Sequence, residues 1–275
     1  MATPIERLGR RITRAVVHFG SFTRFAGGTV SAIALGAPAW ARWSRLAPQL
    51  FFIGAMSVPV IALTGAFIGA ILAIEGYLQF AMIGQEDRLG GVINISLVKQ
   101  IGPVLAAVML AGRVGCSLAA EIGSMRVTEQ LDAMRAMAAD PMRVLVAPRV
   151  VACVVMIPAL TVASNLCGVV GGWIVTTRFY DANPEQYWRF TAAFVSWFDV
   201  FNGLVKSLMF GAAIGVISCY KGFNCRPGAE GVGRATTDTF VVSFIAIIII
   251  NLVAAKFLND MDLIRTGGSA NSLVS

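Results

Sequence analysis

The sequence predicts an all-α integral membrane protein, with one amphipathic helix in the membrane interface followed by five transmembrane helices. Hydrophobic residues make up 57% of the 275 residues and charged residues only 13%, with a mean hydropathy of +0.74. A soluble globular domain is about 25% charged. The apolar residues gather in long runs, and about 20 of them suffice for a helix to cross the hydrocarbon core. The sequence lacks the short alternating segments of a transmembrane β-barrel.

Five segments are apolar enough to cross the membrane. Three contain no charged residue, the second contains only Arg113, and the fourth contains only Lys206, near one end. The expected spans lie at residues 46–74, 101–120, 150–177, 200–220 and 239–255. We therefore expect a single domain across 1–275, made of an N-terminal interfacial region at 1–48, a five-span region at 49–258 and a C-terminal tail at 259–275.

The first segment has the pattern of a helix that lies flat on the membrane, because apolar residues recur at helical spacing between basic ones. The apolar positions are Ile5, Leu8, Ile12, Val16 and Phe19, and the basic positions are Arg7, Arg10, Arg14 and His18. Trp40 and Trp43 follow, where interfacial aromatic residues are typical. The uncharged stretch at 25–41 is rich in small residues and contains Pro38, so we expect it not to span the membrane.

The net charge of +7 indicates contact with a membrane surface rather than with nucleic acid. Seven arginines precede residue 50, beside the first span. Each basic residue in such a position gains about 1 kcal/mol from anionic headgroups. If the N-terminus is inside, the cytoplasmic segments hold 14 basic and 7 acidic residues, and the outside segments hold 7 and 8. This bias predicts a cytoplasmic N-terminus and an extracytoplasmic C-terminus.

The sequence lacks the usual catalytic and metal-binding patterns. His18 is the only histidine, and the five cysteines have no CxxC spacing, so neither histidine-based catalysis nor a zinc or redox site is indicated. The phosphate-binding pattern GxxxxGK[ST] does not occur either. We therefore expect a protein that is not an enzyme and needs no cofactor. If the protein depends on ATP, another chain must hydrolyse the nucleotide.

A polar segment at 111–141 separates the second and third spans and is predicted to lie in the cytoplasm. Its charged residues are Arg113, Glu121, Arg126, Glu129, Asp132, Arg135 and Asp140. Thr128 is positioned to cap a short helix that the pair Asp140-Pro141 would end. The apolar face of this helix would consist of Leu131, Met134 and Met137. Such a helix either lies on the bilayer or contacts a partner, and methionine suits a surface that repacks against a moving partner.

Two further patterns concern the inside of the membrane. Lys99 and Gln100 lie near the outer end of the second span. The lysine either snorkels to the interface or serves a function, since a charge within the membrane is costly. Glycines four residues apart allow helices to approach closely. These pairs are Gly65 and Gly69, Gly168 and Gly172, and Gly211 and Gly215.

Two motifs in the predicted cytoplasmic segments resemble those of a known family. They are AGRVGCSLAAEIGSMRVTEQLDAMRAMAADPMRVLVAPRVVA, from Ala111, and GAEGVGRATT, from Gly228. Together they resemble the MlaE/YrbE permeases of the Mla and Mce lipid-transport ABC systems, over nearly the whole chain. The resemblance implies a permease subunit in the bacterial inner membrane that moves phospholipid. It also implies a homodimer, two copies of a cytoplasmic ABC ATPase and a periplasmic ring of MCE-domain proteins.

The same resemblance implies two groups of functional residues. The family's coupling helix, which contacts the ATPase, corresponds to residues 121–138, between spans 2 and 3. Its candidate contacts are Glu121, Arg126, Glu129, Gln130 and Asp132. The candidate lipid-pocket residues, at the outer ends of the first two spans and between two copies, are Ile74, Tyr77, Leu78, Lys99 and Gln100. Many relatives carry an Arg-Glu pair where this chain has Lys99-Gln100, so here the cation is kept and the acid is lost.

Three alternative functions remain open from the sequence. One is a membrane lipid-binding or scaffold protein that needs no ATPase, and another is an Mce-type importer of sterol or another hydrophobic substrate. A secondary transporter is a third alternative. A coupling-type helix without an ATP site in the same chain favours the ABC permease over the first and the third.

Overall fold

The computed structural model describes residues 4–36 and 41–265, and within these ranges every regular element is helical. Trp40, the predicted tail from residue 266 onward, and the side chains of the predicted amphipathic stripe up to Ile12 lie outside what the structure describes. The first helix, α1 (Pro4–Leu35), continues without a break through the weakly apolar stretch that begins at residue 25. It is not among the described helices that are apolar enough to cross a membrane.

In the described part of the chain, five helical segments are long and apolar enough to span a membrane, which confirms the predicted number. They are Trp43–Met82, Leu89–Val127, Met142–Arg178, Trp197–Phe223 and Ala229–Asp262. Each is longer than the apolar stretch that predicted it, because a helix that leaves the hydrocarbon core continues into the interface with polar residues. The last of them belongs to a helix that runs to Arg265, past the start of the predicted tail.

Several spans are interrupted by tighter or wider helical turns. The first consists of α3 (Trp43–Ile53), the 3-10 turn η1 (Ala55–Ser57) and α4 (Val58–Met82). The second consists of α5 (Leu89–Ser96), the π-helical turn η3 (Leu97–Ile101), α6 (Gly102–Leu110), the π-helical turn η4 (Ala111–Gly115) and α7 (Cys116–Val127). A π-helical turn shifts the register of the side chains that follow it and often occurs at functional sites.

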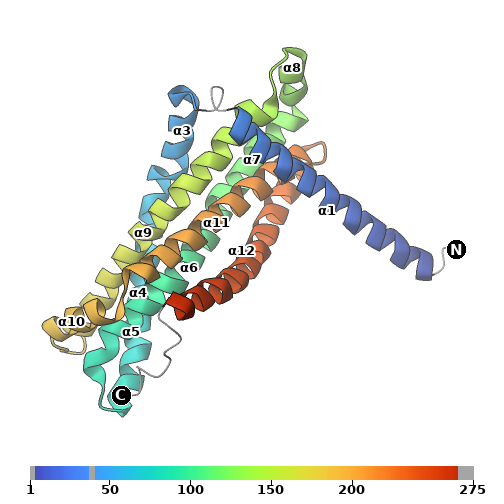
Figure 1. The fold of residues 1–275 in the computed structure, drawn as a ribbon. Helices are drawn as coiled ribbons and strands as arrows, with labels where there is room; N and C mark the ends of the chain where they lie inside the picture. Colours follow the sequence, from blue (N-terminus) through green and yellow to red (C-terminus); the bar gives the residue numbers. More distant parts are fainter. Residues whose placement is uncertain (1–3, 37–40, 266–275) are drawn as a thin grey trace.

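The remaining helices complete the bundle and cover its two ends. The third span contains η5 (Met142–Val146) and α9 (Ala147–Arg178), and the last two are α11 (Trp197–Phe223) and α12 (Ala229–Arg265). The connecting elements are α8 (Gln130–Ala136), η2 (Glu86–Arg88) and α10 (Pro184–Phe194). Figure 1 shows α8 at one end of the bundle and α10 beside α5 at the other, with α1 leading away from the bundle near the α8 end.

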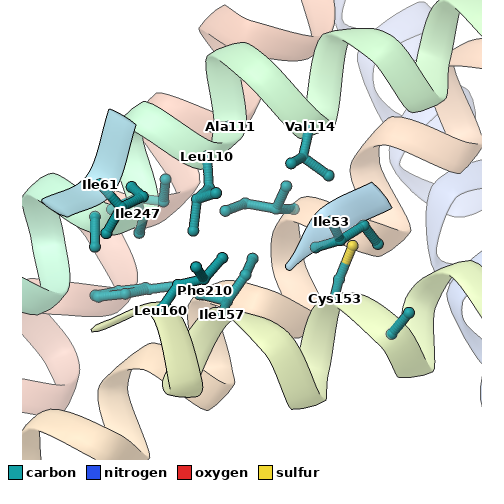
Figure 2. Packing of buried hydrophobic residues seen from close by; sticks show 14 of the residues in the cluster. Ile53, Ile61, Leu110, Ala111, Val114, Cys153, Ile157, Leu160, Phe210 and Ile247 are labelled. Carbon is teal, nitrogen blue, oxygen red and sulfur yellow. The ribbon is translucent and has the colours of Figure 1, made fainter. Parts of the chain in front are cut away.

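The apolar core lies at the middle of the bundle and draws side chains from every span. Figure 2 shows Ile61 of the first span beside Ile247 and Ile53 of the same span beside Cys153, with Phe210 and Ile157 below Leu110. Lipid tails are as apolar as these side chains, so the helices gain little by hiding them from the bilayer. Close packing is therefore what holds the spans together.

Glycines allow the closest helix contacts, as their spacing predicts. A Cβ atom on Gly69 of α4 would collide with the backbone of Gly168 on α9. Further along α9, a Cβ on Gly211 of α11 would lie 2.8 Å from the carbonyl oxygen of Cys153. The helix α9 thus contacts both α4 and α11 backbone to backbone.

A small polar network fixes α10 on α5. The hydroxyl of Tyr187 donates to Asn94 Oδ1 at 3.2 Å, and Asn94 Nδ2 donates to the Thr191 hydroxyl at 2.8 Å. Burial raises the pKa of Tyr187 to about 12, so its phenol stays protonated and able to donate at neutral pH. The network therefore holds α5 in place directly before η3.

The connection between the second and third spans differs from its predicted form. The hydroxyl of Thr128 donates to the carbonyl oxygen of Ser124 at 2.9 Å, so this residue belongs to the end of α7 and does not cap the next helix. Glu129 adopts a left-handed conformation with φ of 60°, and α8 begins only at Gln130. The prediction of a Thr128 cap was wrong, because the threonine hydroxyl bonds to the carbonyl four residues earlier.

The apolar face predicted for this segment is also only partly used. Leu131 is fully buried, Met134 is half-buried and Met137 is 73% exposed. The helix is too short, ending at Ala136, for all three side chains to reach the bundle. The prediction that Asp140-Pro141 ends this helix was wrong, because α8 ends four residues before Asp140. The Oδ1 of Asp140 instead accepts a hydrogen bond from the backbone N–H of Met142 at 3.0 Å, at the start of the third span.

Substitution of Gly69 by alanine tests the contact between α4 and α9. The added methyl group overlaps the Gly168 backbone, so the two helices must separate, at a cost of about 1–3 kcal/mol. The matched control is Gly27→Ala, at an exposed glycine of α1 that has open space around its Cβ position. We expect Gly69→Ala to lower the melting temperature of the purified protein in detergent and Gly27→Ala to leave it unchanged or raise it. Equal melting temperatures for the two variants would contradict the contact.

Candidate functional site

A pocket lined by both polar and apolar residues lies between the second, fourth and fifth spans, towards the α10 end of the bundle. Its volume is about 590 Å³. It is lined by Ile95, Ser96, Lys99, Gln100, Ile101, Lys206, Ala255 and Asn259. At a rise of about 1.5 Å per residue, Lys99 lies about 15 Å from the beginning of its span and Lys206 about 14 Å from the beginning of its own. The two lysines therefore reach the pocket at similar depth.

Lys99 projects from the π-helical turn η3 and makes two ion pairs. Its Nζ lies 3.3 Å from Asp199 Oδ1 and 3.7 Å from Asp262 Oδ2. Asp199 is itself fixed, because its Oδ2 accepts the backbone N–H of Ser196 at 3.0 Å and caps α11. The ammonium group of Lys99, whose side chain is 26% exposed, is therefore paired with two carboxylates that lie near the ends of two other helices.

Lys206 is the more deeply buried of the two lysines, with 2% of its surface exposed. Its Nζ donates to Gln100 Oε1 at 2.6 Å and to the backbone oxygen of Lys99 at 3.1 Å. The sequence marked Lys206 only as a lone cation in an apolar span, which is the signal that could have identified it as functional. Asp199 and Asp262 carried no such signal, because both lie near the ends of helices, where acids are common.

The other three predicted pocket residues lie elsewhere in the single chain. Tyr77 stacks on Tyr180 with ring centroids 4.0 Å apart and packs against a cluster that includes Leu89. Ile74 and Leu78 are 43% and 54% exposed on α4. None of the three lines the pocket around Lys99. The fold therefore brings Lys99 and Gln100 together and leaves the α4 residues on a separate surface.

Four of the five predicted coupling residues form an exposed group at the α8 end. Asp132 lies 3.3 Å from Arg126 Nη1 and 2.8 Å from Arg135 Nη1. Glu129 and Gln130 are exposed beside this pair of contacts, at the sharp bend between α7 and α8. Burial of Leu131 anchors the same bend to the rest of the protein. The helix α8, which follows this bend, lies at one end of the bundle (Figure 1).

Glu121 differs from the other four. It lies 2.5 Å from Arg149 Nη2, and the Arg149 side chain is only 4% exposed, whereas that of Glu121 is 43% exposed. Arg149 also donates to the backbone oxygen of Leu145 at 3.1 Å. This ion pair joins α7 to α9 across the connection that contains α8. The half-exposed carboxylate thus neutralises a buried cation of the third span.

Comparison with known proteins gives a consistent result. The family described as Permease MlaE matches residues 46–257. A probable ABC transporter permease protein of Rickettsia conorii is 42% identical over 90% of this chain and 95% of its own length. A probable ABC transporter permease protein of Synechocystis is 40% identical over 81% of this chain and 83% of its own length.

A relative with a more specific name is the intermembrane phospholipid transport system permease protein MlaE of Haemophilus influenzae. It is 34% identical over 78% of this chain and 82% of its own length. These matches cover all five apolar helices, which make the chain a multi-pass membrane protein. The chain belongs to the MlaE family of ABC transporter permeases.

Proposed function

We propose that this chain is the permease subunit of an ABC transporter that moves phospholipid between the bacterial inner membrane and a periplasmic carrier with MCE domains. The observation that carries the proposal is the pocket of about 590 Å³, in which two lysines border a cavity inside membrane-spanning helices. Burying a cation at this depth in the membrane is energetically costly. A cation found there therefore indicates a functional site. The phosphate of an amphiphilic lipid is a ligand that suits both the cations and the apolar surroundings.

The acyl chains need an apolar surface close to the headgroup site. Ile74 and Leu78 are exposed on α4, and Tyr77 lies beside them. We propose that two copies of the chain form a homodimer in which these residues line the acyl-chain region near the outer leaflet. The headgroup then lies at the pocket that contains Lys99 and Gln100.

Energy input is proposed at the opposite end of the bundle. With the N-terminus in the cytoplasm, as the distribution of basic residues predicts, α8 and the end of α7 project into the cytoplasm. Two copies of a separate ATPase would contact Arg126, Glu129, Gln130 and Asp132. The buried Leu131 and the ion pair between Glu121 and Arg149 support transmission, because they join this segment rigidly to the second and third spans.

The transport cycle follows from these two ends. ATP binding and hydrolysis in the partner would close and open the homodimer through α8. Closure narrows the space between the two copies and moves a phospholipid between the pocket and the MCE-domain ring. The permease itself performs no chemical step, so its residues bind, orient and release the lipid.

Reversal of charge at Lys99 tests the headgroup site. Lys99→Glu places a third carboxylate beside Asp199 and Asp262 and makes the pocket more negative, so we expect about tenfold less co-purified phospholipid, which corresponds to about 1.4 kcal/mol of added repulsion. Arg189→Glu, at an exposed cation of α10, is the matched control and should retain the lipid. Lipid is quantified by mass spectrometry of the detergent-purified protein. Equal lipid content in the two variants would refute the headgroup role.

Charge reversal on α8 tests the coupling assignment. We expect Glu129→Lys combined with Asp132→Lys to reduce the amount of ATPase that co-purifies. Both carboxylates are exposed in the single chain, and in the proposed complex they would contact the ATPase directly. Glu86→Lys combined with Glu185→Lys makes the same change in charge at the other end of the molecule and should not affect the ATPase. Both proteins must elute as monodisperse species. An intact complex with the α8 variant would show that the ATPase binds elsewhere.

A further inference from the structure

We propose that Lys206, rather than Lys99, is the principal phosphate ligand of the pocket, and that Gln100 positions it without neutralising it. The site lies within one chain, between the second, fourth and fifth spans. This inference rests on the proposed function, because it assigns the headgroup phosphate of the transported lipid to particular atoms. It makes the amide at position 100 a determinant of which lipids are bound.

The two lysines differ in how their charges are compensated. Lys99 has carboxylate partners at 3.3 and 3.7 Å. Both acceptors of Lys206 are uncharged, one a side-chain amide and the other a backbone carbonyl. Among the residues that the structure describes, no carboxylate forms an ion pair with Lys206 within 4.0 Å. The positive charge available to a ligand is therefore that of Lys206.

Burial makes this difference matter. Lys206 is 2% exposed and lies in a span, where an ammonium group without a counter-ion is costly. An ammonium group has three N–H donors, and the protein accepts two of them. Lys206 also borders the cavity, so an oxygen of a bound phosphate can accept the third. A phosphate supplies the missing counter-ion and the missing acceptor together.

Other groups around the cavity suit a phosphodiester. Asn259 lines it, and its side-chain amide can donate a hydrogen bond to a further phosphate oxygen, whereas the Ser96 hydroxyl donates to the backbone oxygen of Val92 at 2.8 Å. Ile95, Ile101 and Ala255 give the remaining wall an apolar character, which suits the glycerol and acyl ends of a lipid. A free phosphate ion would leave this apolar wall without a partner. The lining therefore favours a phosphate that is attached to an apolar body.

Gln100 controls the charge of the site. Its Oε1 lies 2.6 Å from Lys206 Nζ, so glutamate at this position would have the same shape and would form a direct ion pair. In that ion pair the glutamate carboxylate would neutralise the positive charge of Lys206. A phosphate would then have to compete with a carboxylate that is already in place.

The experiment uses the full chain purified in detergent together with the partners that co-purify with it. Two short-chain probes are compared by native mass spectrometry and by titration, dihexanoyl phosphatidylglycerol and the phosphate-free dihexanoylglycerol. We expect Gln100→Glu to weaken binding of the phosphate-bearing probe by about tenfold or more, the effect of one charged hydrogen bond, and to leave the phosphate-free probe unchanged. Gln85→Glu, at an exposed glutamine before η2, is the matched control and should change neither.

Each other outcome is decisive. The inference fails if Gln100→Glu binds the phosphate-bearing probe as tightly as the wild type, or if the wild type binds both probes equally. If inorganic phosphate competes for the site as strongly as the lipid probe does, the inference that the bound phosphate belongs to a lipid is wrong. A wild-type protein that binds neither probe would instead refute the proposed function. Gln100→Glu changes one partly buried amide, and unchanged binding of the phosphate-free probe shows that the variant is folded.

Discussion

The backbone contact between α4 and α9 at Gly69 and Gly168 is the interaction on which the rest of the bundle depends. Helices in a bilayer are not driven together by removal of apolar surface from water, since lipid is equally apolar. Their association requires close van der Waals contact, and only glycine lets two backbones approach this far. Because α9 also contacts α11 at Gly211, displacement of α9 would disturb its contacts with two other spans.

Polar links occupy the two ends of this apolar bundle. At the α8 end, Glu121 neutralises the buried Arg149 and joins the second span to the third. At the α10 end, Lys99 joins the second span to Asp199 of the fourth and Asp262 of the fifth. Between them lies a core made of residues such as Ile157 and Phe210. A rigid core between two polar ends is the arrangement that the proposed transmission of force requires.

The number of spans and the glycine contacts could be predicted from the sequence because each depends on a short stretch of residues. Hydropathy is a local sum, and Gly65 and Gly69 lie on one face of any helix that contains them. The details of the connection after Val127 could not be predicted in the same way. Thr128 was expected to cap the following helix, yet its hydroxyl donates to the carbonyl oxygen of Ser124 in the preceding one. Which of the two helices the hydroxyl bonds to depends on where α7 ends.

The candidate site shows the same division more sharply. The sequence alone determined that the chain is a five-span membrane protein, that its cations within the membrane are few, and that the segment with Glu129 and Asp132 is polar. Only the tertiary structure decided that Lys206 meets Gln100, about 100 residues earlier in the chain, while Lys99 turns to Asp199. Those pairings depend on how three helices are rotated about their axes and on the register shift at η3, and neither quantity is encoded in the local composition of a span.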